Sequence, residues 1–271
     1  MIRFSWAGAL AAAWALLAAS PALAQDAAPP GAFTVFGWYL HRASLGAGVE
    51  PDYLGSNDYR FAPSGSISFA RKGDEAGPWG APDDGFSVGL VGDRTLSAGL
   101  VGRWRSGRDD KNDLRGLDKI DGAVEAGLFA DGWPADWLRL RGEVRHGVSG
   151  HDKWTADLGA DAVGRTGAWT LSIGPRLTWA DSDFTALYFG VSPAEAARSP
   201  FGIKPFAAGG SFWEPGVLAS AEYRLNHAWS VTGVAEYRRL TGDAADSPLV
   251  SGLGSKDQLY ASLHVTYAFV P

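Results

Sequence analysis

Residues 149–152 read Ser-Gly-His-Asp and so contain, in one short stretch, the nucleophile, base and carboxylate that hydrolases use. In a Ser-His-Asp triad, tertiary structure holds the base between the other two groups. Residues as close in sequence as Ser149, His151 and Asp152 rarely reach that geometry. We therefore interpret the stretch as a solvated hairpin turn, and a barrel hydrolase is the less favoured hypothesis.

A second candidate is the pair of carboxylates in the repeat Ala-Glu-Tyr-Arg, at residues 221–224 and 235–238. Glycosidases use two carboxylates about 5 to 10 Å apart, and Glu222 and Glu236 could meet this distance across a hairpin. However, Arg224 and Arg238 each follow two residues later on the same face. Carboxylates compensated in this way stay ionised, so neither is suited to act as an acid.

The same logic applies to a larger set of charges, because basic residues on one stretch stand opposite acidic residues on the next. Ion pairs between them are the favoured interpretation, and a small, weakly selective pore is the alternative. The set is Arg139, Arg141, Glu143 and Arg145, with Asp157 and Asp161. The five histidines, His41, His146, His151, His227 and His264, show no metal-binding spacing such as H-E-x-x-H. We predict no catalytic, cofactor-binding or metal-binding residues and no cofactor, with His264 in a polar network.

The elements that position these residues are strands, because apolar and polar residues alternate with a period of two. In the last stretch Leu259, Leu263 and Val265 share one face, and Ser262 and His264 share the other. The same alternation predicts strands at residues 43–49, 96–105, 124–131, 137–145, 154–162, 169–179, 217–225, 229–238 and 258–269, with weaker candidates at 61–69 and 86–91.

Alternation alone does not distinguish a soluble sandwich from a membrane barrel, but three other features favour the barrel. Many stretches reach the roughly 9 to 11 residues of a tilted membrane strand. Tryptophans such as Trp104, Trp154 and Trp229 lie at strand ends, as in interfacial girdles. Short turns, as at residues 226–228, alternate with long polar loops, as at 181–210. The sequence predicts an all-β fold consisting of one transmembrane antiparallel β-barrel.

The number of strands follows from parity, because bacterial single-chain barrels have an even number. Eight strong candidates run from residue 96 to the C-terminus, and three more precede them. The odd total favours twelve strands, with one more strand within residues 32–85. Ten strands remain the alternative, if one candidate is not a strand.

The N-terminus predicts export. Arg3 precedes an apolar run at residues 7–19 and an Ala-Leu-Ala cleavage site at 22–24, which together indicate a signal peptide. We predict a signal peptide at 1–24, a periplasmic segment at 25–36 and the barrel at 37–271.

The chain has no cysteine, which excludes disulfides and thiolate chemistry, and its formal net charge of −6 argues against nucleic acid.

Several stretches then resemble the MipA/OmpV family of Gram-negative outer-membrane proteins, also called the MltA-interacting protein family. The most specific are "LTWADSDFTALYFGVSPAEAARS" at residues 177–199 and "LTGDAADSPLV" at 240–250. Shorter matches lie at 53–60, 107–110, 124–130, 158–164 and 254–258, so the resemblance covers the mature chain in order. It implies a non-enzymatic outer-membrane scaffold that binds a murein lytic transglycosylase and a murein-synthesising penicillin-binding protein.

The long loops predict further local features. Ser192-Pro193-Ala194-Glu195 forms a capping box with proline at the first helical position, which predicts a single short helix through Arg198. This helix either covers the external mouth of the barrel or belongs to a loop that packs on itself.

Outer-membrane lipid and lipopolysaccharide are the expected neighbours of the protein. Divalent cations are attracted to the acidic loop residues, but no dedicated cation site is predicted; these residues are Asp109, Asp110, Asp113, Asp243 and Asp246.

Overall fold

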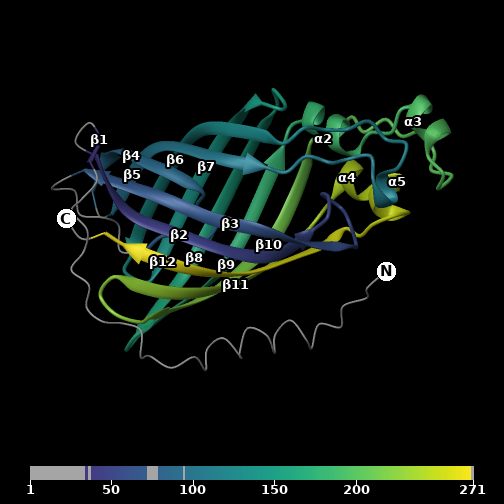
Figure 1. The fold of residues 1–271 in the computed structure, drawn as a ribbon. Coiled ribbons are helices and arrows are strands. Elements are labelled where there is room, and N and C mark those ends of the chain that lie inside the picture. Colours follow the sequence, from purple (N-terminus) through teal and green to yellow (C-terminus); the bar gives the residue numbers. More distant parts are fainter. Residues whose placement is uncertain (1–33, 36–37, 72–78, 94, 270–271) are drawn as a thin grey trace.

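The chain forms one curled sheet whose long strands run between short turns at one end and long loops at the other (Figure 1). The computed structural model describes residues 34–35, 38–71, 79–93 and 95–269. The strands are β1 (Thr34–Val35), β2 (Trp38–Pro51), β3 (Tyr59–Arg71), β4 (Phe86–Gly92), β5 (Leu96–Arg105), β6 (Ala123–Ala135), β7 (Leu138–Ser149), β8 (Trp154–Thr166), β9 (Trp169–Ala180), β10 (Phe212–Arg224), β11 (Trp229–Arg239) and β12 (Asp257–Ala268).

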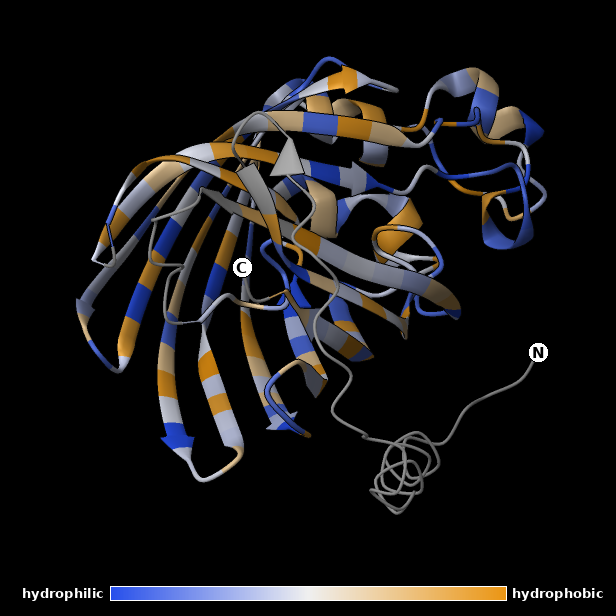
Figure 2. Ribbon diagram, turned by 60° about the vertical axis from the view of Figure 1, so that its left-hand side comes forward, coloured by the Kyte–Doolittle hydropathy of each residue, from blue (hydrophilic) through white to orange (hydrophobic). Residues whose placement is uncertain are grey.

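The alternation predicted from sequence is present along these strands, as the orange and blue bands in Figure 2 show. Leu128, Leu158 and Ile173 are exposed on the outer face, whereas Glu125 and Arg139 are buried inside. A soluble sandwich would bury the apolar face instead. The outward apolar face and the polar interior therefore identify the outside of the sheet as its lipid-facing surface.

The barrel closes through an unusual seam. Each wall strand from β4 to β12 is antiparallel to the next, β12 pairs with β2, and β2 pairs with β3. The last junction, between β3 and β4, is parallel and comprises only Ser68↔Ser87 and Phe69↔Val88. A ring with one parallel junction has an odd number of strands, and here eleven strands form the wall.

The parity argument made from sequence is therefore wrong for the wall, although the sheet as a whole has twelve strands. The twelfth, β1, has two residues and pairs only with Trp38 and Tyr39 at the start of β2. The ten-strand alternative is wrong because the three candidates that precede residue 96, at 43–49, 61–69 and 86–91, are all strands. The physical reason for the odd ring is that residues 79–85, between β3 and β4, lie inside the barrel, so that β4 runs in the same direction as β3.

Two turns at one end are shorter than predicted because the strands before them extend further than their apolar pattern. β6 continues to Ala135 and β8 to Thr166, which leaves residues 136–137 and 167–168 as turns. In the turn before β11, Asn226 Oδ1 accepts hydrogen bonds from Ala228 N and Trp229 N, both at 2.9 Å. Ring pairs such as Trp229–Tyr267, with centroids 4.8 Å apart, lie at this end, as expected of an interfacial girdle.

The long loops at the other end fold into a cap with its own apolar core, and this differs from the single helix predicted. It contains η1 (Asn112–Leu114), α2 (Ser182–Phe189), α3 (Pro193–Arg198), α4 (Gly242–Asp246) and α5 (Pro248–Ser251). Phe184, Phe189 and Phe212 are fully or nearly buried together with Leu240. Packing of apolar residues from several loops, which no single loop sequence reveals, stabilises the additional helices.

No helix among the described residues is long and apolar enough to cross a membrane. The predicted signal peptide at 1–24 lies outside the described residues. Of the predicted periplasmic segment at 25–36, only Thr34–Val35 is described. These boundaries remain predictions.

Candidate functional site

The inner faces of β6, β7 and β8 carry a buried network of arginines and carboxylates. The strand register places Arg139 opposite Asp161 and Glu143 opposite Asp157. Arg145 donates from Nε to Glu125 Oε2 at 3.0 Å and from its two other nitrogens to Glu143 and Asp157. The ion pairs predicted between these strands are confirmed. Because the side chains of Arg145 and Glu125 are 1% and 0% exposed, each charge depends on its partners rather than on water.

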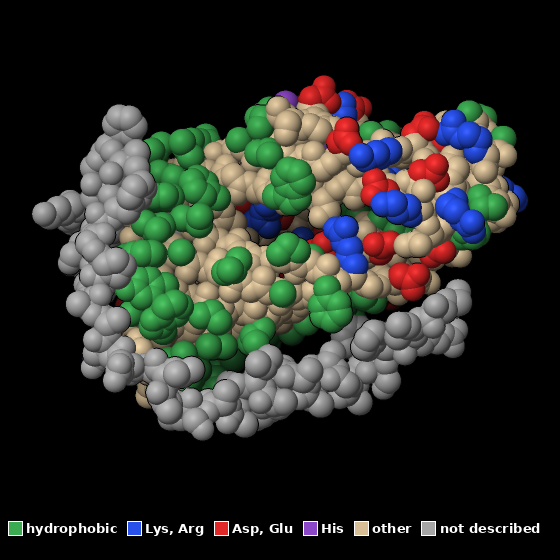
Figure 3. Space-filling view, viewed as in Figure 1, with side chains coloured by type: hydrophobic (Ala, Val, Ile, Leu, Met, Phe, Trp, Pro, Cys, Tyr) green, Lys and Arg blue, Asp and Glu red, His purple; other side chains and the backbone are tan. Residues whose placement is uncertain are grey.

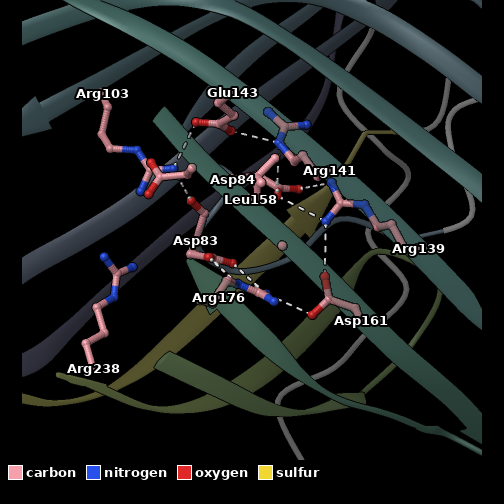
Figure 4. A pocket seen from close by; sticks show the side chains of 12 residues that line it. Asp83, Asp84, Arg103, Arg139, Arg141, Glu143, Leu158, Asp161, Arg176 and Arg238 are labelled. Atoms are coloured by element: carbon pink, nitrogen blue, oxygen red, sulfur yellow. Dashed lines mark hydrogen bonds and ion pairs between the residues drawn. The ribbon is translucent and has the colours of Figure 1, made fainter. Parts of the chain in front are cut away.

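A loop segment inside the barrel, residues 79–85, completes this network (Figure 4). Both oxygens of Asp83 accept from Arg176, at 2.8 and 3.2 Å, and both oxygens of Asp84 accept from Arg139, at 3.1 and 2.8 Å. Such two-pronged bonds suit arginine, whose planar group matches a carboxylate. The segment thereby places two acidic groups between strands β7 and β9 and fixes its own position in the lumen.

An aromatic contact anchors the same segment. Trp79 is buried with Ala81 against Trp133 and Val163, which point inward from β6 and β8. The guanidinium carbon of Arg139 lies 5.7 Å from the ring centroid of Trp79, within the range of a cation–π interaction. The described lumen is thus filled by side chains over this half, apart from a pocket of about 370 Å³ that includes space open to solvent.

Sequence patterns do not predict the inward position of residues 79–85. The signal that could have found it is Pro82-Asp83-Asp84-Gly85, a polar break between two strands with the wrong parity for a simple turn. Ser87, which follows, lies in a G-x-S-x-G sequence at residues 85–89. Its hydroxyl lies 2.8 Å from Arg141 Nη2 and 3.2 Å from the carbonyl of Asp84, within a strand rather than a strand-to-helix elbow.

The stretch at residues 149–152 does not form a triad. Ser149 Oγ accepts from Val124 N at 3.2 Å. His151 has both ring nitrogens engaged, with Nε2 3.2 Å from Glu125 Oε1 and Nδ1 accepting from Lys153 N at 3.2 Å. Asp152 is exposed and pairs with Lys153. The serine and the aspartate therefore have other partners, and His151 extends the buried network toward the external end.

The repeated Glu residues are also apart. Glu222 is opposite Thr232, and Glu236 is opposite Leu218, so the two lie four residues apart along the hairpin, roughly 14 Å. Glu236 pairs with Arg238 at 2.6 Å, as predicted, whereas Glu222 pairs with Arg42 of β2 at 3.0 Å instead of Arg224. The expectation that these carboxylates could meet across the hairpin is wrong, because a strand repeat of fourteen residues does not match the hairpin register.

His264 lies on the last strand, β12, and makes polar contacts as predicted. Its Nε2 lies 2.7 Å from Ser262 Oγ and 3.5 Å from Ser64 Oγ of β3. The side chains around it are small, since Gly46 is its register partner on β2. His264 therefore belongs to a small hydrogen-bonding group on the inner face, as predicted.

The cap is held by a second buried ion pair. The predicted capping box is present at α3, where Ser192 Oγ accepts from Glu195 N and Glu195 Oε2 accepts from Ser192 N. Glu195 Oε1 also accepts from Asp118 N at 2.9 Å and lies 3.4 Å from Arg108 Nη2. Burial raises the pKa of Glu195, but these hydrogen bonds outweigh it and hold the pKa below its usual value. The helix thus packs on loop 106–121.

The acidic loop residues have local partners. Asp243 Oδ2 accepts from Gly209 N and Gly210 N, both at 2.8 Å, and Asp109 lies 3.0 Å from Lys111 Nζ. These backbone hydrogen bonds lower the pKa of Asp243. Within the described residues, no group of three or more His, Cys, Asp or Glu side chains is arranged to hold a metal ion.

Long strands with apolar outer faces, aromatic rings at their ends and a polar interior define an outer-membrane β-barrel. The chain belongs to the family described as MltA-interacting protein MipA, whose model matches residues 43–269. It is 37% identical over 84 residues to the MltA-interacting protein of Escherichia coli K12, covering 31% of this chain and 33% of that protein. It is 29% identical over 172 residues to the outer membrane protein OmpV of Vibrio cholerae, covering 60% of each.

Similar solved structures are also outer-membrane proteins. OmpT of Vibrio cholerae has a TM-score of 0.34 and 7% identity over 87% of this chain and 99% of that one. A porin has a TM-score of 0.32 and 13% identity over 86% and 100% of the two chains. The likeness is weak, and the barrel fold of this chain follows from its own strand pairings. The protein is located in the outer membrane.

Proposed function

We propose that this protein is a closed scaffold of the cell envelope that binds a murein lytic transglycosylase and brings it together with a murein-synthesising penicillin-binding protein. The observation that carries the proposal is that residues 79–85 and the arginine network fill the half of the lumen lined by β6 to β9. The name of the Escherichia coli relative, MltA-interacting protein, supports a transglycosylase as the partner. A barrel with a filled lumen acts through its surfaces.

We place the partner surface at the short-turn end, which faces the periplasm in barrels of this kind. The turns at residues 136–137, 167–168 and 225–228 are small compared with the roughly 800 Å² per partner of a standard interface. Exposed Trp137 lies in the first of these turns and exposed Trp229 directly follows the last, and tryptophan is enriched among residues that dominate binding energy. The predicted segment 25–36 would add area, since Thr34–Val35 pairs with β2 at this end.

The proposal is tested by crosslinking in intact cells. A photoreactive amino acid is introduced at His227 or Thr166, at the turn end, and at Lys204 in an external loop as the matched control; all three side chains are exposed. We expect a lytic transglycosylase among the products from the turn-end positions and not from Lys204. Repeated capture without any murein enzyme would refute the scaffold proposal for this chain.

The alternative function, a narrow channel for small solutes, is distinguished by planar-bilayer conductance. The paired charges of the lumen support the expectation that the wild-type protein gives no steady openings. Steady openings whose selectivity changes in Arg139→Ala or Glu236→Ala would instead identify the lumen as a conducting path and contradict the closed scaffold.

A further inference from the structure

The barrel wall is interrupted between β3 and β5 in its external half. β3 and β4 pair only at Ser68 and Phe69, and β4 begins at Phe86, opposite Gly102 of β5. Among the described residues, no strand therefore lies between residues 59–67 of β3 and 103–105 of β5. Within the hydrocarbon region, backbone N–H and C=O groups need partners, and open sheet edges facing lipid are not tolerated. The unpaired backbone groups of this edge therefore favour a polar partner at the break.

A strand from another protein is a poor candidate for this partner. Pro63 lies in the middle of the open part of β3, and proline has no N–H to donate. Prolines on edge strands discourage the addition of a further strand. The edge is therefore better suited to a ligand that does not need a continuous ladder.

The rim of the break is apolar on its outer side. Phe61 of β3 is 78% exposed and Trp104 of β5 is 66% exposed, and both belong to the lipid-facing sets of their strands. Ile67 and Leu100 continue these sets toward the turn end and are also exposed. Acyl chains can lie along such a surface as they do along the rest of the barrel.

The inner side of the break carries both arginines and carboxylates, and Arg103 is the arginine of β5 that lines the pocket there. Arg103 points inward from β5, where its Nη2 donates to Glu143 Oε2 at 3.1 Å and to the carbonyl of Asp83 at 2.8 Å. Its Nε has no hydrogen-bond partner among the described residues, although the atom is buried. Figure 3 shows basic and acidic side chains at the bottom of a hollow among hydrophobic side chains on this face.

The carboxylates near Arg103 are shared with other arginines. Glu143 also pairs with Arg141 and Arg145. Asp83 also pairs with Arg176. Asp157, which likewise lines the pocket, pairs with Arg145. In Figure 4, Arg103 stands at one side of the pocket, apart from the cluster around Arg139.

We propose that the break is a lateral binding site for a lipid of the outer leaflet with an anionic phosphomonoester head, with the phosphate at Arg103 and the acyl chains along Phe61 and Trp104. A phosphate supplies acceptor oxygens for the free Nε. The site is separate from the turn end, where we place the protein partner. Its test can therefore fail without affecting the scaffold proposal.

The proposal is tested by native mass spectrometry of the full mature protein in detergent, with diacyl phosphatidic acid or diacyl phosphatidylcholine of the same chain length. We expect retention of phosphatidic acid over phosphatidylcholine, and about tenfold less retention in Arg103→Gln, which loses a charge-assisted hydrogen bond. Arg224→Gln, at an exposed position at the turn end, is the matched control and should bind as the wild type does. Arg103→Gln should fold, because Glu143 keeps two arginine partners.

Two further measurements test the acyl-chain surface and the source of the phosphate. Phe61→Ala with Trp104→Ala should reduce retention of phosphatidic acid severalfold, whereas Leu128→Ala with Leu158→Ala, exposed on unbroken wall, should not. Inorganic phosphate at millimolar concentration should not displace the lipid. Equal retention of both lipids, equal retention by Arg103→Gln and Arg224→Gln, or full displacement by inorganic phosphate would each overturn the proposal.

Discussion

The wall formed by β6 to β9 and the wall formed by β2 and β3 share the same alternation of polar and apolar residues. They differ in the side chains that face the lumen. The first lines the lumen with long charged side chains, such as Arg139, Glu143 and Arg145, which are buried and cross-linked. The second has small inner residues, Ser44, Gly46, Ala62, Ser64 and Ser66, and none of these is buried. Buried ion pairs and small, unburied inner residues thus lie on opposite sides of one barrel.

The two walls also differ in their backbone pairing. β7 and β8 are paired along both edges, whereas β3 has one edge that is open from residue 59 to residue 67. Because the segment that fills the lumen leaves the wall between β3 and β4, the same chain reversal that buries Asp83 and Asp84 also produces the open edge. The position of residues 79–85 between β3 and β4 thus explains both the side chains that fill part of the lumen and the short pairing of β3 with β4.

The largest expected effect concerns the buried network. Arg145→Ala removes the shared partner of Glu125, Glu143 and Asp157, and loss of one partner from a buried ion pair costs about 3 to 5 kcal/mol. Arg42→Ala, in the open wall, breaks a pair with Glu222 whose side chains are 28% and 17% exposed, and should cost less than about 1 kcal/mol. Urea unfolding in detergent micelles, followed by tryptophan fluorescence, measures both. Equal losses would mean that the two walls do not differ.

An intermediate effect concerns the seam. Amides in residues 59–67 should exchange with solvent deuterium about a hundredfold faster than those of β7 and β8, because the open edge allows local separation without opening the whole barrel. Hydrogen exchange of the folded protein in micelles, read by mass spectrometry of peptides, measures this ratio. β11, which is paired on both edges, is the control. Uniform protection around the ring would contradict the weak seam.

The smallest expected effect is a pH dependence in the packed wall. Burial lowers the pKa of His151, an effect that Glu125 opposes and that Arg105 and His146 reinforce. Because the unfolded chain then binds the proton more readily, the free energy of unfolding should decrease as the pH falls below about 6.5, by less than about 1 kcal/mol.

His151→Gln removes this contribution, whereas His227→Gln, at an exposed turn position, should leave it unchanged. Urea midpoints of the three proteins at pH 7.5 and 5.5 provide the comparison. If the wild type and His151→Gln lose stability equally on acidification, the buried neutral imidazole is not the cause.

The sequence determined the membrane barrel, the strand positions and the side chains that face the lumen. A period of two fixes which residues share a face, and exposed apolar faces with terminal tryptophans can be satisfied only by lipid. Local capping rules likewise placed α3, because Ser192, Pro193 and Glu195 act within four residues. These signals are short in range and need no knowledge of neighbouring strands.

Tertiary structure alone decided the register, the seam and the filling of the lumen. The sequence suggested that Glu222 and Glu236 are close across the hairpin. The hairpin register separates them by four residues, and Glu222 forms its ion pair with Arg42 of β2. Asp83 and Asp84 resembled an ordinary polar loop, and only the convergence of Arg139 and Arg176 from separate strands brings them inside. Long-range ion pairing is invisible to local patterns, because it depends on where the closed ring places residues distant in the chain.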